Sequence, residues 1–148
     1  MAETNLDSFA DQPWLDEVGK PLSEMVLALF RSGGAAGQAA KNALHGVWLG
    51  HPLHPVLTDV PIGAWTTALA LDAREVATGD AGYGRAADFA VGLGLAAALG
   101  AAFTGLTDWS ETQGKSRRLG LLHGLLNLTA TGVVAVSYAL RRSEEHTS

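Results

Sequence analysis

The side chains best suited to chemistry are concentrated in residues 45–65, which hold three of the five histidines and three of the five prolines. Two later segments add polar groups to apolar surroundings: an aspartate at position 108, and a histidine and an asparagine at 123 and 127. The four-residue spacing of that last pair puts both side chains on one face of a helix. The candidate ligands are His51, His54 and His123, and the candidate neighbours that would orient them are Asp59, Asp108 and Asn127.

Several kinds of site use these residue types. Two histidines on different helices ligate haem iron in helical bundles, so haem b is one candidate cofactor. Three imidazoles with a carboxylate would equally suit a transition metal such as zinc, copper or iron. A quinone head group or a proton relay needs only histidine and carboxylate within hydrogen-bond reach. The structural alternative is that His51 and His54 satisfy groups at a helix end while His123 bonds Asn127 or a carbonyl. The residues alone leave these alternatives open.

Long apolar segments predict the elements that position these residues. Residues 89–107 and 119–140 contain no charged side chain, and about 20 apolar residues cross a bilayer as a helix. A helix entered at Pro52 is long enough for a third span, although Asp59 then has to be paired, protonated or near an interface. We predict an all-α integral membrane helical bundle over residues 51–141, and a soluble bundle is the less favoured alternative. The expected spans are about 52–77, 86–107 and 119–140, with a fourth helix missing.

The two ends of the chain have a different character. Residues 1–20 are acidic and irregular in pattern, which predicts a flexible tail. Residues 21–50 predict two amphipathic helices that lie at the membrane interface or cover the bundle end, the first beginning at Pro21 and stopping at Gly33. Residues 142–148 resemble the translation of a sequencing adapter, so we expect a non-native tail there.

Composition excludes several classes of function. The net charge is −5 and no basic stripe is present, which argues against a nucleic-acid partner. The absence of cysteine excludes disulfides and an iron–sulfur cluster held by this chain. There is no basic, early apolar segment typical of a cleavable signal, and no serine-nucleophile or phosphate-loop motif. The many small residues suit close helix packing in a lipid bilayer, within this chain or in a homo-oligomer.

Alternating spans would bring the polar groups to one side of the membrane. The first span starts at His51 and His54, the second ends at Asp108, and the third begins just before His123. We therefore expect these residues to converge near one membrane face, with Asp59 about two helical turns deeper. The lysine and arginine counts on the two sides are nearly balanced, so the orientation stays open.

Three segments carry a resemblance to a known family. Residues 44–65 include Gly50-His-Pro-Leu-His-Pro55, residues 105–109 read Gly-Leu-Thr-Asp-Trp, and residues 120–127 read Gly-Leu-Leu-His-Gly-Leu-Leu-Asn. Over about residues 35–141 the chain resembles a bacterial family of predicted membrane proteins of unknown function. Members similar to it are often fused to a C-terminal Rieske 2Fe–2S domain behind a fourth membrane helix.

The resemblance implies a multi-pass protein of the bacterial inner membrane. It implies an anchor or electron-transfer module of a Rieske-type oxidoreductase, with the Rieske domain as partner in cis and no catalytic activity of its own. His51 or His54 opposite His123 would then hold haem or a metal. A purely structural anchor or interaction module is the first alternative, and movement of protons or small solutes is the second.

Overall fold

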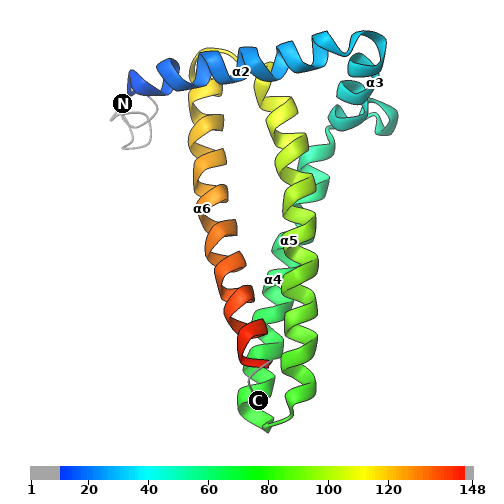
Figure 1. Ribbon diagram of the computed structural model, residues 1–148, viewed down its shortest axis with the longest axis vertical. Coiled ribbons are helices and arrows are strands. Elements are labelled where there is room, and N and C mark those ends of the chain that lie inside the picture. Colours follow the sequence, from blue (N-terminus) through cyan, green and yellow to red (C-terminus); the bar gives the residue numbers. More distant parts are fainter. Residues whose placement is uncertain (1–10, 146–148) are drawn as a thin grey trace, which may run out of the picture. The chain divides into compact units, whose positions relative to one another are not determined.

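The computed structural model describes residues 11–145, and these residues form α-helices joined by short turns (Figure 1). No β-strand occurs in this described part, so the all-α prediction is confirmed. The helices in chain order are α2 (Trp14–Ser32), α3 (Gly34–His45), α4 (Leu53–Thr78), α5 (Ala81–Ser110) and α6 (Gly114–Glu145), with a 3₁₀ turn η1 (Val47–Leu49) between α3 and α4.

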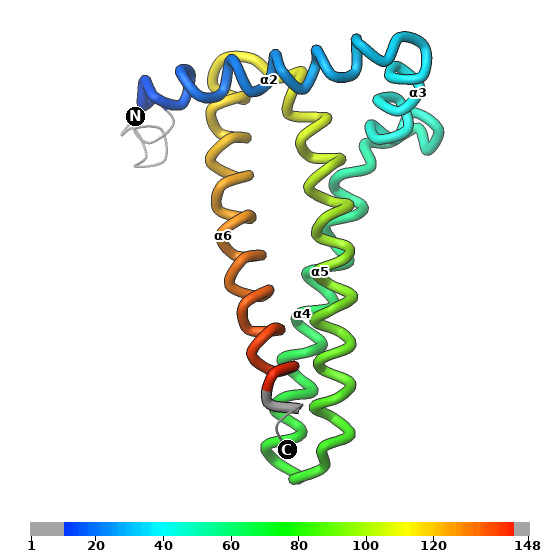
Figure 2. Tube along the Cα trace, viewed as in Figure 1, coloured from blue at the N-terminus to red at the C-terminus, as the bar shows by residue number. Residues whose placement is uncertain are grey.

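The described residues divide into two compact units. The first unit contains residues 11–54 and 102–127, which include α2, α3, η1, the end of α5 and the start of α6. The second unit contains residues 55–101 and 128–145, which are the remaining parts of the three long helices. Each of α4, α5 and α6, traced in Figure 2, contributes residues to both units.

The first unit is built on α2, which crosses the end of the hairpin formed by α5 and α6 (Figure 1). Leu15 of α2 is fully buried against Trp109 of α5 and Leu121 of α6. Trp109 also donates a hydrogen bond of 2.8 Å from Nε1 to the carbonyl of Arg117. Its indole lies against Gly120, where a side chain would clash with the ring. Trp109 therefore joins α2 to both helices of the hairpin.

The predicted tail and the predicted start of the first helix need correction. The helix begins at Trp14 and not at Pro21, so residues 14–20 are helical; it ends at Ser32 before Gly33, as predicted. The helix extends this far because Leu15 gains a buried site and Asp16 gains two arginine partners, and neither contact is visible in the local sequence. Residues 1–10 of the predicted tail lie outside the described residues.

The connection between α5 and α6 is also shorter than predicted. Only residues 111–113 separate the helices, where a polar loop was expected up to Arg118. Arg117 and Arg118 are helical, and each lies 3.1 Å from a carboxylate oxygen of Asp16. Pairing with α2 compensates the two adjacent positive charges in the first turn of α6. At its other end α6 continues to Glu145, through the first residues of the predicted non-native tail, and residues 146–148 lie outside the described part.

The second unit is a packing of small side chains from α4, α5 and α6. Its buried centre consists of Ala68, Ala87, Ala90 and Val91, with Val134 and Tyr138 of α6 against it. Gly94 is buried under the indole of Trp65, and Gly92 lies against the phenol of Tyr138. Small residues at contact positions let helix backbones approach closely, which is typical of helices that pack within a membrane.

An ion triad ties the three helices of this unit together. Arg141 of α6 donates to Asp72 of α4 over distances of 2.5 and 2.8 Å, and to Asp88 of α5 over 3.2 Å. The turn between α4 and α5 consists of Gly79 and Asp80, and the Asp80 carboxylate accepts a 2.8 Å hydrogen bond from the Gly82 amide. This cap lets α5 begin at Ala81, before the predicted start of the span near residue 86.

Among the described residues, α5 and α6 are long and apolar enough to cross a membrane. Only 22% of the most apolar window of α5 and 6% of that of α6 is buried within the protein. A helix in the core of a soluble protein would bury most of this surface, so the exposure favours a lipid environment. The predicted third span, α4, is not among these helices. Its apolar sequence is interrupted by Pro55 and Pro61 and by four charged side chains, Asp59, Asp72, Arg74 and Glu75.

Candidate functional site

Two of the predicted ligands meet in the first unit. His54 near the start of α4 and His123 of α6 are 69 positions apart in sequence, and their ring centres lie 6.3 Å apart with the ring planes at 90°. His54 is half-buried, whereas His123 is exposed. The predicted meeting of a histidine from residues 51–54 with His123 is thus realised by His54.

Gly105 and Asn127 determine how these two rings are held. A Cβ added at Gly105 of α5 would lie 2.7 Å from Cε1 and 2.8 Å from Nδ1 of His54, so only glycine lets this imidazole lie on α5. The Asn127 amide donates a 2.8 Å hydrogen bond to the His123 carbonyl, and its nitrogen lies 3.2 Å from Nε2 of the same ring. The predicted pairing of Asn127 with His123 along α6 is present.

Two other predicted site residues are placed elsewhere. His51 precedes α4 and is exposed, and its Nδ1 lies 3.0 Å from the carbonyl oxygen of the adjacent Pro52. Asp59 is exposed on the part of α4 that belongs to the second unit. Its predicted role beside an imidazole stays a prediction.

Asp108 contacts a histidine that the sequence analysis did not select. His45, the last residue of α3, lies with Nδ1 2.5 Å from Asp108 and Nε2 3.0 Å from Glu111. The first contact is a hydrogen bond, whereas Nε2 has no hydrogen-bond geometry toward any described residue. Lys41, one turn earlier on α3, is paired with the other oxygen of Glu111. We call these four residues the α3 ion cluster.

The α3 ion cluster fastens a helix that has little else to hold it. No residue of α3 is fully buried, so its attachment to the end of α5 depends on charge. The Lys41 ammonium holds the pKa of the Glu111 carboxyl below its usual range. A signal for this contact exists in the sequence: basic side chains four apart at 41 and 45 match acidic side chains three apart at 108 and 111. It was missed because nothing local indicates that α3 reaches residue 108.

The geometry limits what the paired histidines can bind. Among residues 11–145 no group of three or more histidine, aspartate or glutamate side chains lies close enough to hold a metal ion. A site for zinc or copper built from protein ligands alone needs at least three. Haem iron takes only two ligands from the protein, since the porphyrin supplies the other four. Of the cofactors considered, haem suits a pair of imidazoles best.

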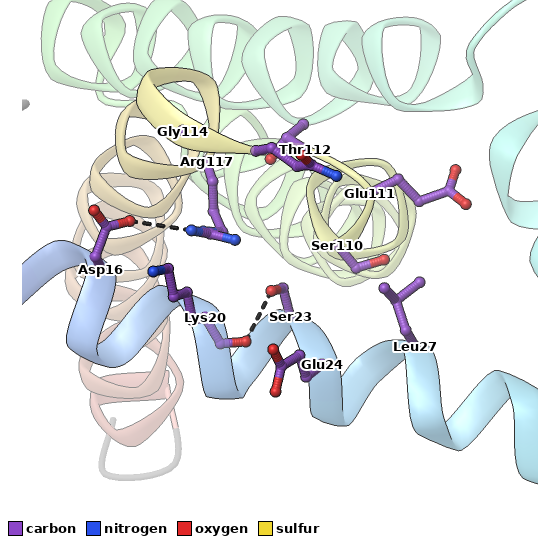
Figure 3. A pocket seen from close by; sticks show the side chains of 11 residues that line it. Asp16, Lys20, Ser23, Glu24, Leu27, Ser110, Glu111, Thr112, Gly114 and Arg117 are labelled. Carbon is purple, nitrogen blue, oxygen red and sulfur yellow. Dashed lines mark hydrogen bonds and ion pairs between the residues drawn. The ribbon is translucent and has the colours of Figure 1, made fainter.

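A hollow between α2 and the turn of the α5–α6 hairpin has a different lining (Figure 3). Asp16 and Lys20 of α2 lie along its edge, with Arg117 opposite, and the Arg117 guanidinium lowers the pKa of the Asp16 carboxyl. The Ser23 hydroxyl donates to the Lys20 carbonyl over 2.9 Å. The lining carries charges of both signs, and its Ser23 hydroxyl is already hydrogen-bonded, so the hollow is suited to hold water. No predicted site residue lines it.

Comparison with known proteins places the chain in a family. The model of the family described as "Predicted membrane protein (DUF2231)" matches residues 50–148. That range contains all six predicted site residues, whereas His45 precedes it. Comparison with curated proteins and with solved structures gave no match. The resemblance to a family of predicted membrane proteins is therefore confirmed, while the association with a Rieske domain stays a prediction. This chain belongs to the DUF2231 family of predicted membrane proteins.

Proposed function

We propose that this protein is a multi-pass module of the bacterial inner membrane that transfers electrons through a haem b held between His54 and His123. The observation that carries the proposal is the 6.3 Å separation of the two imidazoles. An imidazole nitrogen lies about 2 Å from a bound metal and the ring centre about 1 Å farther, so two imidazoles across one ion have centres about 6 Å apart. His54 and His123 are therefore the residues that would hold the haem, and the distance between their ring centres is compatible with one iron bound by both.

The surroundings of the pair suit this role. Gly105 lets the His54 ring lie against α5, which restricts its orientation. His123 is exposed, so a flat ring system can approach it without displacing a side chain packed over it. When bound, haem would supply one-electron transfer, and the His54 and His123 imidazoles and the polarity around them would influence its potential.

The partner that we propose is a Rieske 2Fe–2S domain, as the family resemblance implies. The chain has no cysteine, so the two cysteine ligands of such a cluster have to come from another segment or protein. In this arrangement α4 would be a third span, with Asp59 near the membrane boundary. The chain then anchors the electron-transfer partner and catalyses no reaction on its own.

An absorbance spectrum tests the haem proposal. The protein, expressed with a haem precursor and purified in detergent, should show a Soret band and sharpened visible bands after reduction with dithionite. His54→Ala and His123→Ala should each abolish these bands. His51→Ala is the matched control and should retain them, because the His51 side chain is exposed and its Nδ1 lies 3.0 Å from the carbonyl oxygen of the adjacent Pro52. Absence of the bands, or their survival in both ligand variants, would refute the proposal.

A structural anchor without cofactor is the second candidate. It is favoured by the Asn127 nitrogen, which lies 3.2 Å from Nε2 of His123, and by the perpendicular contact between the two rings, because both give the histidines partners within the protein. On this alternative His54→Ala reduces the free energy of unfolding in detergent, and no spectral band depends on it.

A further inference from the structure

We propose that the apolar strip of α2 and the turn η1 form a docking surface for lipid, so that α2 lies in the plane of the membrane boundary with one side among the acyl chains. The strip consists of Trp14, Val18, Met25 and Leu29, and η1 adds Val47, Trp48 and Leu49. All seven belong to the first unit, and each is between 43 and 69% exposed. The inference is independent of any cofactor.

The three faces of α2 have three different environments. Leu15, Gly19, Ser23 and Val26 are buried and form the face toward the α5–α6 hairpin. The apolar strip lies beside this face, since successive residues are about 100° apart around the helix. The exposed charged residues Glu17, Glu24 and Arg31 occupy the opposite side. A helix with one face on protein, one apolar and one charged fits a boundary between lipid and water.

Continuity with the lipid-facing surface of the hairpin identifies the occupant. α2 lies across the point where α5 ends at Ser110 and α6 begins at Gly114, and these two helices are the ones apolar enough to cross the membrane (Figure 1). Close to that point in the chain, the last turns of α5 expose Phe103 and Leu106, and the second turn of α6 exposes Leu119. An apolar strip at the end of two such helices is therefore at the depth where lipid head groups meet acyl chains.

The turn η1 has the composition expected at the same boundary. Trp48 is 69% exposed and its Nε1 donates a 3.1 Å hydrogen bond to the Ala43 carbonyl, so the polar edge of the indole is satisfied while the apolar part faces outward. Gly46 and Gly50 on either side have φ of +78° and +70°, values that favour glycine. The turn between them leaves its three apolar side chains exposed. Tryptophan is enriched at membrane–water interfaces for this combination of an apolar body and one polar group.

Charge does not drive this docking. α2 carries Asp16, Glu17 and Glu24 against Lys20 and Arg31, so anionic lipids gain no net attraction from it. The proposal therefore specifies burial of apolar side chains in lipid of any head group, and a vesicle of neutral phosphatidylcholine is a sufficient probe.

Site-directed spin labelling tests the surface, and the absence of native cysteine makes each label unique. The full chain with Met25→Cys or Leu29→Cys is labelled and reconstituted into phosphatidylcholine vesicles. Collisions with molecular oxygen, which concentrates in lipid, and with a water-soluble nickel chelate are then measured. Glu24→Cys is the matched control, because it is adjacent to Met25 on the charged side of the same helix.

We expect oxygen collisions at positions 25 and 29 to exceed nickel collisions severalfold, and the reverse at position 24. Equal nickel access at 24, 25 and 29 would overturn the proposal by placing the strip in water. Exclusion of both reagents at 25 and 29 would also overturn it, because the strip would then be covered by protein, such as a second copy. None of these results depends on haem, so they remain separate from the test of His54 and His123.

Discussion

The two units of this chain use the same three long helices in different ways. In the second unit the helices meet through alanine and glycine, and one arginine with two carboxylates joins them. In the first unit the contacts are made by histidines, carboxylates and a tryptophan from elements far apart in sequence. The packing of the second unit depends mainly on the shape of its small side chains. The contacts of the first unit depend mainly on charge and leave polar side chains accessible. The two candidate ligands that meet, His54 and His123, both belong to the first unit.

The largest effect is expected where the second unit is most tightly packed. Gly94→Val puts a branched side chain against the indole of Trp65, where even a Cβ clashes. We expect the free energy of unfolding in an SDS titration to fall by about 3 kcal/mol. Gly132→Ala in the same unit is the control, since nothing lies within 4 Å of its added Cβ. Equal stability of the two variants would contradict the conclusion that the second unit is stabilised by close packing of small side chains.

The second largest loss of stability is expected when the ion triad of Arg141, Asp72 and Asp88 is broken. Arg141→Met leaves the Asp72 and Asp88 carboxylates without their shared partner, and we expect a loss of about 2 kcal/mol in the same titration. The combination with Asp72→Asn and Asp88→Asn should recover most of the loss, because no unpaired charge remains. If the triple variant is no more stable than Arg141→Met, the triad contributes through packing of the arginine stem and not through charge.

Gly105→Ala tests the first unit by the same criterion of volume. The added methyl group displaces the His54 ring, and we expect a loss of about 1 kcal/mol, since a ring that is half-buried can move. The haem bands, where present, should weaken with it. Gly124→Ala, with open space around its Cβ, is the matched control. A loss as large as that of Gly94→Val would mean that both units are packed alike.

Acid should affect the first unit by the smallest amount. The pKa of the Asp16 carboxyl is lowered by Arg117, and that of Glu111 by Lys41. A carboxyl with a lowered pKa in the folded state stabilises it above the ordinary value, near 3.8 for Asp16 and 4.5 for Glu111, and this stability is lost as the pH falls further. The protection of the amides in α2 and α3, measured as hydrogen-exchange rates relative to the intrinsic rates at each pH, should therefore be constant from pH 7 to 5 and weaken below about pH 4.

Asp16→Asn and Glu111→Gln provide the control for the acid effect. Each variant should show at neutral pH the weakened protection that the natural chain acquires only in acid, Asp16→Asn in α2 and Glu111→Gln in α3. Because both carboxyls are partly exposed, the effect is expected to stay below about 1 kcal/mol for Glu111. Protection that is independent of pH in the natural chain would show that charge does not hold these helices.

Elements indicated by patterns that extend over many residues were predicted well. The uncharged segments identified α5 and α6 as helices long and apolar enough to cross a membrane, and the paired glycines after Ser32 identified the end of α2. Helix starts were predicted poorly at residues 14, 81 and 114. In each case the extra helical turns are stabilised by a contact with a distant residue or by a side-chain cap, as with Leu15 on Trp109 and Asp80 on Gly82.

The candidate site also has features that could be predicted from the sequence and features that could not. The meeting of a histidine at the start of α4 with His123 of α6 could be predicted, because histidines in the apolar segments are few and lie near the ends of the expected spans. The choice of His54 over His51 could not, since it depends on the side of α4 that faces α6. The partner of Asp108 could not be predicted either, because it requires α3 to fold back along residues 108–111.

The sequence by itself determined that this protein is helical, that two of its helices are apolar enough for a bilayer, and which few polar residues lie in them. Hydrophobic length and charge spacing are local properties, and they can be read without knowing what any helix contacts. Only the tertiary structure decided which histidines meet, that Gly105 makes room for one of them, and that α2 presents an apolar strip beside its buried face. Those outcomes depend on the rotation of each helix about its axis, which is fixed by contacts between residues far apart in the chain.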